Sequence, residues 1–293
     1  MKHPHDGVLL LAHGTIHDVS ELPDFLKSVR RGRPAPEALV AEMRHRYEAI
    51  GGSPLLRYTR EQAQGLEARL GLPVEVAMRL WSPRVEDVLP QMLARGVNRV
   101  CLLPLAPFSV DVYVEAAKAA AATPAAGAVE WVSVGAWGTD PGFVASHVAS
   151  IERWVKDDVP LVLTAHSLPT RIIAMGDRYA IEVEACVAAI AAKLGRPVRL
   201  AYQSQGADGG DWLGPDLASV LQQLVNEGES SVAIAPVGFL ADHVETLYDL
   251  DIEVRAQCAH LGLTLTRVPA LNTEPLFLDA LADLVRRSLA NAA

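Results

Sequence analysis

The sequence predicts an α/β protein made of two similar halves, each a four-stranded parallel sheet flanked by helices, with a cleft between them. Short runs rich in leucine and β-branched residues alternate with alanine-rich stretches of helical length along the 293 residues, which is the pattern of parallel α/β layers. Strings of residues around the strands of the first half also recur in the second half. Each half is therefore expected to be Rossmann-like.

Eight short apolar runs are expected to form the strands, four in each half. Their leucine-rich or β-branched composition favours strands that are buried in a parallel sheet. They are Val8–Ala12, Val74–Leu80, Arg99–Pro104, Val129–Val134, Leu161–Ala165, Val198–Gln203, Val232–Val237 and Leu263–Val268.

The longer stretches between these runs are expected to form helices. Many of them are rich in alanine, a strong helix former. They are Ala35–Ile50, Thr59–Leu70, Val85–Ala94, Val112–Ala122, Pro141–Lys156, Glu182–Leu194, Asp216–Asn226, His243–Ala259 and Pro275–Ala290.

Two pairs of similar strings indicate that the halves arose by duplication. Val8–Gly14 resembles Leu161–Ser167, and Gly96–Pro104 resembles Gly228–Pro236; convergence of repeated βαβ units on short strings is the alternative. The expected domains are residues 1–140 and residues 141–293, with the C-terminal helix free to pack back on the first half. The first half is the longer one, and its extra residues, about 16–56, are expected to form a lip at the cleft.

Composition and charge exclude several classes of protein. An apolar content of 50% can build a large core, and a net charge of −9 argues against nucleic acid as a partner. The three cysteines, Cys101, Cys186 and Cys258, are far apart and form no C-x-x-C pair, so neither a disulfide framework nor a structural zinc site is expected. No apolar run approaches the length of a membrane span, and we expect a soluble cytoplasmic protein. Dinucleotide, Walker and nucleophile-elbow motifs are absent.

A row of carboxylates follows the seventh expected strand. Glu245, Asp249 and Glu253 are spaced by four, so a helix would place them along one stripe, where like charges repel by roughly a few tenths of a kcal/mol per pair. A row of oxygen ligands beside a histidine suits a hydrated divalent cation such as Mg²⁺ or Fe²⁺. The alternative is an acidic first turn that complements the helix macrodipole.

Two histidines occupy matching positions in the two halves. His166 follows the fifth expected strand and His13 follows the first. The carboxyl ends of parallel strands are where open α/β sheets hold their sites, and an imidazole takes up and releases protons near neutral pH. Both are therefore candidate functional residues, unless each is a hydrogen-bonded side chain that closes a turn.

The lip carries basic residues and a glycine-rich loop. Arg30, Arg31 and Arg33 lie close together in an acidic chain, and because guanidinium groups bind carboxylates as a fork, an organic polyacid is a candidate ligand. A solvated turn is the alternative. The loop Gly51–Leu55 allows either a close approach to a flat ligand or a tight turn.

Motifs across nearly the whole chain resemble those of the ferrochelatases, which insert iron in the last stage of haem biosynthesis. The motifs occur in family order, and the most specific pair is A-H-S-L-P with D-H-x-E-T-L-Y-x-L-D. The matching strings are Leu9–Thr15, Tyr47–Leu55, Met78–Pro83, Ala165–Pro169, Gln203–Ser204, Trp212–Pro215, Gly238–Asp251 and Pro269–Asn272.

The resemblance implies a chelatase-like fold and insertion of Fe²⁺ into protoporphyrin IX or coproporphyrin III. It assigns His166 and Glu245 to the insertion site as catalytic residues and metal ligands. Asp249 and Glu253 become the outer steps of a metal path, on a helix that the family often winds as a π-helix. Iron is then a substrate and not a resident cofactor. Mg²⁺ is a candidate ion at the outer carboxylates. No iron–sulfur cluster is expected, because no cysteine follows Cys258.

The same resemblance assigns Arg30, Arg31 and Ser53 to the binding of the porphyrin substrate. His13 departs from the family, which often has tyrosine there, and is a candidate axial ligand to the inserted iron. The arginine-rich lip resembles the branch that uses coproporphyrin, whereas Met78–Pro83 resembles the branch that uses protoporphyrin, so the choice of porphyrin stays open. The role of His166, as proton acceptor or metal ligand, also stays open.

Two other functions are alternatives to this reading. One is a cobalt chelatase that acts on sirohydrochlorin or a related tetrapyrrole, and the other is a haem-binding protein without enzymatic activity. The expected partners are the porphyrin and Fe²⁺, with no nucleic acid. Transient membrane contact is a further expectation because the product is apolar, and the sequence leaves the oligomeric state open.

Overall fold

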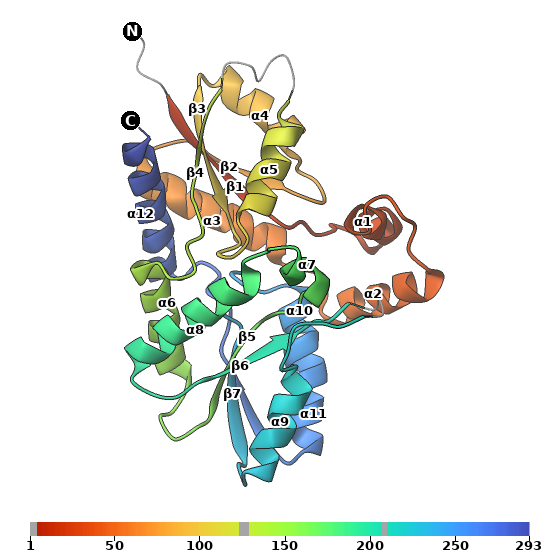
Figure 1. Ribbon diagram of the computed structural model, residues 1–293. Helices are drawn as coiled ribbons and strands as arrows, with labels where there is room; N and C mark the ends of the chain where they lie inside the picture. The colour runs from red at the N-terminus through yellow and green to blue at the C-terminus, as the bar shows by residue number, and fades with distance from the viewer. Residues whose placement is uncertain (1–4, 123–128, 207–209, 293) are drawn as a thin grey trace. The chain divides into compact units, whose positions relative to one another are not determined.

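The chain forms two compact units in the computed structural model, which describes residues 5–122, 129–206 and 210–292 (Figure 1). One unit comprises Met1–Ala136 together with Phe277–Ala293, and the other comprises Trp137–Leu276. Each unit holds a four-stranded sheet whose neighbouring strands are all parallel. The prediction of two four-stranded parallel sheets flanked by helices is confirmed, and the cleft between the halves stays a prediction.

The strands follow the same spatial order in both units. The first sheet has the order β2-β1-β3-β4 and the second has the order β6-β5-β7-β8, as expected if one half is a copy of the other. All strands begin and end close to the predicted runs. They are β1 (Asp6–Ala12), β2 (Val74–Met78), β3 (Arg99–Pro104), β4 (Glu130–Ser133), β5 (Leu161–His166), β6 (Arg199–Gln203), β7 (Ser231–Ala235) and β8 (Thr264–Arg267).

Helices connect the strands and cover the sheets. In the first unit they are η1 (Val19–Glu21), α1 (Leu22–Val29), α2 (Glu37–Ala49), α3 (Leu55–Leu70), α4 (Val85–Ala94), α5 (Asp111–Ala120) and α12 (Pro275–Asn291). In the second unit they are α6 (Pro141–Trp154), α7 (Thr170–Ala174), α8 (Tyr179–Leu194), α9 (Leu217–Asn226), α10 (Val244–Leu247), the π-helical turn η3 (Asp249–Val254) and α11 (Arg255–His260).

The predicted lip contains two helices, of which the sequence indicated only one. Between β1 and α3 lie η1, α1 and α2. The unpredicted α1 begins with a proline in its first turn and buries Leu22, Phe25 and Leu26, which have helical spacing but span only two turns. Tyr47 of α2 is also buried, and its hydroxyl lies 3.2 Å from that of Thr15, just after β1.

The last helix of the chain, α12, belongs to the first unit and packs beside α3. Gly65 of α3 packs closely against α12, because a Cβ at this position would lie 2.6 Å from Cδ1 of Leu278, whose side chain would have to shift. Arg69 of α3 also forms an ion pair of 2.6 Å with Asp279. On the other face of this sheet, α4 and α5 share a buried cluster with β1 and β3 that includes Leu9, Leu89, Leu102 and Val114.

The second sheet is covered in the same way on its two faces. A buried cluster joins β5, β6 and β7 to α9, η3 and α11 through residues such as Val162, Leu221, Ile234, Leu250 and Cys258. Helices α6 and α8 pack together on the opposite face (Figure 1). The chain therefore leaves β5 toward one face and β7 toward the other.

Two features of the described residues bear on where the protein acts. None of the helices in residues 5–122, 129–206 and 210–292 is long and apolar enough to cross a membrane. All three cysteines are buried as free thiols. The cytoplasmic location stays a prediction.

A buried histidine makes the stability of the fold sensitive to acid. His147 of α6 is 4% exposed, its ring packs edge-on against Phe143 at 4.6 Å, and its Nε2 has no hydrogen-bond partner among the described residues. Burial lowers the pKa of His147 from 6.5 to about 3, so the folded chain holds it neutral while the unfolded chain protonates it. The difference has no effect on the free energy of unfolding well above pH 6.5, and it lowers that free energy progressively as the pH falls from 6.5 toward about 3.

We therefore expect acid to destabilise the wild type more than a His147→Gln variant. Between pH 7.5 and pH 5, the free energy of unfolding of the wild type should fall by about 2 kcal/mol more than that of the variant. Urea unfolding at the two pH values measures the difference. An equal decrease in both proteins would show that His147 is not the group responsible.

Candidate functional site

The strongest candidate site lies at the carboxyl edge of the second sheet, where β5 and β7 are neighbours. The chain leaves β5 through α7 and α8 toward β6, and it leaves β7 through α10, η3 and α11 toward β8. Because α8 and α11 cover opposite faces (Figure 1), this edge is a topological switch point, where open α/β sheets hold their ligands. His166 is the last residue of β5, and Glu245 lies in α10.

His166 and Glu245 form a hydrogen-bonded pair. The His166 Nδ1 and the Glu245 Oε2 are 2.9 Å apart, and about a third of each side chain is exposed. Burial of the His166 ring opposes its charged form, but the charge and hydrogen bond of Glu245, together with the charge of Asp249, outweigh that effect and raise the pKa of His166. The second ring nitrogen, Nε2, makes no hydrogen bond within the described residues, so it can meet a proton donor or a metal ion.

Neighbouring main-chain groups hold this pair in place. The Tyr179 hydroxyl donates to the carbonyl of His166 at 2.9 Å, and the side-chain amide of Gln203 donates to the carbonyl of Glu245 at 2.8 Å. Gly238, which follows β7, approaches β5 so closely that a Cβ there would lie 2.9 Å from Cα of Ala165. A larger residue at position 238 would therefore push the two strand ends apart.

The segment that carries the carboxylates is not one continuous α-helix. The sequence predicts a helix over His243–Ala259, whereas the structure has α10, then the π turn η3, then α11. The Glu253 N–H donates to the Tyr248 carbonyl at 3.0 Å, a bond that spans five residues, and such π turns occur frequently at functional sites. The helix predicted over His243–Ala259 and the π winding that the resemblance implies are both confirmed, although residue spacing alone does not distinguish an α-helix from a π-helix.

The three carboxylates differ in their exposure to solvent. Glu245 is partly exposed, Asp249 is 8% exposed and Glu253 is exposed. In an α-helix, four residues make slightly more than one full turn. In the wider π-helix, four residues make slightly less than one full turn. The two drifts oppose each other, so Glu245, Asp249 and Glu253 stay near one line along the segment.

Asp249 is held by a residue from the next strand. The hydroxyl of Ser204, directly after β6, donates a short hydrogen bond to Oδ2 of Asp249. Ser204 has a positive φ of 59°, which turns its side chain back toward the π turn. Within the described residues, no group of three or more His, Cys, Asp or Glu side chains is arranged to hold a metal ion at one point.

The predicted residues of the first half lie in the first unit at several separate positions. His13 is exposed directly after β1, and its carbonyl accepts a hydrogen bond from the Leu80 N–H at 2.9 Å. Arg30 ends α1, and Arg31 follows it with a positive φ of 56° in the turn toward α2.

Ser53 lines a pocket of about 710 Å³ in the first unit. Other lining residues include Tyr47, Arg57 and Arg60, and neither Arg30 nor Arg31 is among them. The structure thus separates the predicted substrate residues into a basic turn and a pocket, which the sequence treats as one lip. Arg57 and Arg60 carry no sequence signal beyond their charge.

Several residues beside the pair were not predicted to belong to the site. Tyr179, Gln203 and Ser204 support His166, Glu245 and Asp249 through single hydrogen bonds. Gln203 and Ser204 are part of the motif resemblance, so a signal for them exists at the end of β6. Tyr179 has no comparable signal.

His243 is the N-cap residue of α10 and was also not predicted as a site residue. Its Nδ1 is buried without a hydrogen-bond partner among the described residues, and its ring packs against Phe239 at 5.2 Å. Burial lowers the pKa of His243, in opposition to the nearby carboxylates Glu245 and Asp242. His243 is therefore held neutral more readily than His166.

Comparison with known proteins identifies the family. The ferrochelatase family model matches residues 5–289. A ferrochelatase of Acidobacterium capsulatum is 37% identical over 97% of this chain and 94% of its own length. A coproporphyrin III ferrochelatase of Anoxybacillus flavithermus is 36% identical over 97% of this chain and 96% of its own length.

A solved structure shares the fold at much lower identity. The SirB protein of Bacillus subtilis, solved with Fe³⁺, superposes with a TM-score of 0.62 at 16% identity, over 98% of this chain and 96% of its own. That likeness supports the two-sheet architecture alone. The family match over nearly the whole length decides the assignment: the chain belongs to the ferrochelatase family, and it is a metal chelatase that inserts iron into a porphyrin.

Proposed function

We propose that iron insertion takes place at the His166–Glu245 pair, on the switch point between β5 and β7. The observation that carries this proposal is the 2.9 Å contact between a half-buried imidazole and a carboxylate. Their partial exposure leaves both groups accessible to a ligand, and the Nε2 of His166 makes no hydrogen bond within the described residues.

Insertion requires that both inner pyrrole protons leave the porphyrin and that ring nitrogens replace the water ligands of Fe²⁺. In this proposal the Nε2 of His166 accepts a pyrrole proton while the Glu245 carboxylate, bonded to Nδ1, stabilises the imidazolium that forms. The imidazolium then loses a proton to solvent through Glu245, so His166 is neutral again and can accept the second pyrrole proton. Glu245 can also serve as an oxygen ligand to the incoming iron. The raised pKa of His166 favours this proton transfer.

We further propose that Asp249 and Glu253 lead the metal to the pair. Hard carboxylate oxygens bind Fe²⁺ and Mg²⁺ without the permanence of a thiolate site. Glu253 is exposed and Asp249 is buried beside Ser204, so a cation would lose its water in steps along the segment. Mg²⁺ is a candidate occupant of the same outer carboxylates.

The substrate carboxylates are proposed to meet the basic turn and the pocket of the first unit. Arg30 and Arg31 offer planar forks for propionate groups, and Ser53 lines the pocket with Arg57 and Arg60. Coproporphyrin III carries more carboxylates than protoporphyrin IX, so it gains more from such a surface. His13 is kept as a candidate axial ligand, and a cytoplasmic location with transient membrane contact stays part of the proposal.

Removing either member of the pair should stop the chemistry and leave substrate binding intact. We expect His166→Ala and Glu245→Gln each to lower kcat by about 10²- to 10⁴-fold, because general acid–base catalysis is lost, while porphyrin affinity measured by fluorescence quenching stays near that of the wild type. The exposed His260→Ala and Glu229→Gln are the controls. Turnover at the wild-type rate in either site variant would contradict the assignment.

Asp249→Asn should affect the metal more than the porphyrin. We expect the KM for Fe²⁺ to rise by about tenfold or more, in line with the loss of a metal-directing carboxylate, with a smaller change in the KM for porphyrin. Steady-state kinetics with each substrate varied in turn measures both values, and the exposed Asp157→Asn is the control. An unchanged iron dependence would exclude Asp249 from the metal path.

Arg30→Ala and Arg31→Ala should weaken the porphyrin and spare the metal. We expect each to raise the KM for coproporphyrin III more than that for protoporphyrin IX, with Lys27→Ala on the same helix as control. Insertion rates with both porphyrins, and with sirohydrochlorin and Co²⁺, measure the preference. Equal increases in the KM values for both porphyrins would show that these arginines do not select the substrate. Turnover of sirohydrochlorin alone would overturn the proposed reaction.

A further inference from the structure

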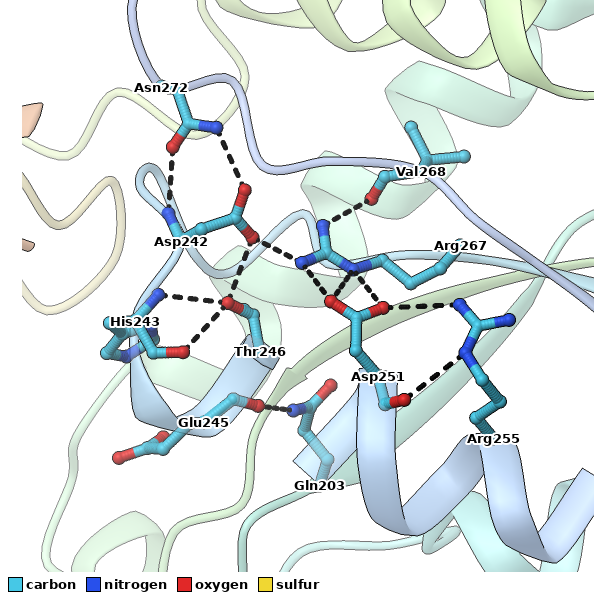
Figure 2. Close-up of polar contacts among 10 residues, drawn as sticks. All are labelled: Gln203, Asp242, His243, Glu245, Thr246, Asp251, Arg255, Arg267, Val268 and Asn272. Atoms are coloured by element: carbon cyan, nitrogen blue, oxygen red, sulfur yellow. Dashed lines mark hydrogen bonds and ion pairs between the residues drawn. The ribbon is translucent and has the colours of Figure 1, made fainter. Parts of the chain in front are cut away.

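A single buried arginine joins the two ends of the segment that carries Glu245 and Asp249 (Figure 2). Arg267 is the last residue of β8, and its side chain is 6% exposed. Its guanidinium donates to Oδ1 of Asp242 at 2.6 Å and to Oδ2 of Asp251 at 2.9 Å through the same nitrogen, Nη2. Asp242 precedes Glu245 in the chain and Asp251 follows Asp249, so Glu245 and Asp249 lie between the two anchors.

Asp242 fixes the start of the turn that presents Glu245. The side-chain amide of Asn272 donates to Oδ2 of Asp242 at 2.8 Å, and the Thr246 hydroxyl donates to Oδ1 at 2.9 Å. The same hydroxyl accepts from the His243 N–H at 3.0 Å. A chain of hydrogen bonds therefore runs from Arg267 through Asp242 and Thr246 to the residues on both sides of Glu245.

Asp251 fixes the π turn on the other side. The Arg267 Nε lies 3.1 and 3.2 Å from the two Asp251 oxygens, in addition to the Nη2 bond. Arg255 also meets Asp251, at 3.4 Å, but it lies on the same helical segment and half of its side chain is exposed. Arg267 alone of these two arginines connects the π turn to the sheet.

The buried charges make this contact hard to replace. Burial opposes ionisation of Asp242, but Arg267, Asn272 and Thr246 more than offset it and lower the pKa of the carboxyl group. Loss of Arg267 would leave a buried carboxylate without its counter-charge, which is strongly unfavourable. Lysine keeps the charge but has one nitrogen at its tip, so it would lose the bonds that the Arg267 Nε donates to the Asp251 oxygens and that Nη1 donates to the Val268 carbonyl.

We propose that Arg267 is a positioning residue for iron transfer, which sets the spacing between Glu245 and Asp249 by binding Asp242 and Asp251 together. The inference rests on the proposed site at His166 and Glu245. If the link is broken, the π turn can shift relative to the Glu245 turn, and iron passes between the carboxylates less well. Porphyrin binding, which we place on other residues, does not depend on it.

Arg267→Lys tests the link, with Arg255→Lys as the matched control because both arginines contact Asp251. We expect Arg267→Lys to raise the KM for Fe²⁺ by about 10- to 100-fold, as outer-shell changes around metal ligands do, with less than about a twofold change in the KM for porphyrin. Arg255→Lys should leave both values near those of the wild type. The split between the two KM values separates positioning from a general loss of structure, which would affect both substrates.

Asp251→Asn serves as the second variant if Arg267→Lys unfolds, as judged from its Tm. It keeps the buried Arg267–Asp242 pair and weakens only the π-turn end, and we expect a rise in the KM for Fe²⁺ in the same direction. Glu245→Gln is assayed in parallel. Wild-type insertion by Glu245→Gln would overturn the site itself, whereas an inactive Glu245→Gln with wild-type iron dependence in the folded Arg267 or Asp251 variant would overturn the role of Arg267 alone.

Discussion

The site depends on one constraint: the connections that follow β5 and β7 run to opposite faces of the sheet. Neighbouring parallel strands bring His166 and the turn before Glu245 to the same edge, while the connections to α8 and to α11 go to opposite faces. The edge is therefore not covered by a connection running over it. Gly238 approaches Ala165 closely beside the same edge, where His166 and Glu245 are 2.9 Å apart.

Two ion-paired groups near this edge have opposite physical character. The Arg267–Asp242 pair is almost fully buried and is surrounded by further hydrogen bonds, so it resists change and gives the segment a fixed geometry. The His166–Glu245 pair is partly exposed and can exchange a proton or accept a ligand. A chelatase needs both kinds of group, because a rigid frame must hold a carboxylate that takes up and releases a metal.

The two units present the same sheet edge, but different connections leave it. Both units have the same strand order, and His13 follows β1 as His166 ends β5. In the first unit the chain then enters the lip with α1 and α2, which leads to the basic turn and the pocket beside Ser53. In the second unit the matching strand β5 leads to α7 and α8, whereas β7, which matches β3, leads into the carboxylate segment. In the proposed function, the substrate carboxylates bind to residues of the first unit and the metal binds to residues of the second.

Much of this arrangement is readable from the sequence because apolar periodicity and strand-end motifs are local signals. The strands and the placement of His166 at a strand end follow from such signals, and the family motifs identify Glu245 and Asp249. Short or irregular elements cannot be predicted from such signals. Helix α1 spans only two turns, and the carboxylates of the π turn have the spacing expected of an α-helix. Arg267 was also unpredictable: its two carboxylate partners lie far from it in sequence and meet it only through the pairing of β7 with β8.

The most direct test of the central claim is to locate the metal at the site. Crystals soaked with Co²⁺ as a stand-in for Fe²⁺ would give an anomalous difference map that marks the ion independently of any assay. The account predicts a peak within coordinating distance of the His166 Nε2 or of the Glu245 carboxylate, and its loss in a Glu245→Gln crystal. A peak that lies elsewhere, or one that persists unchanged in the variant, would contradict the assignment of the insertion site to this pair.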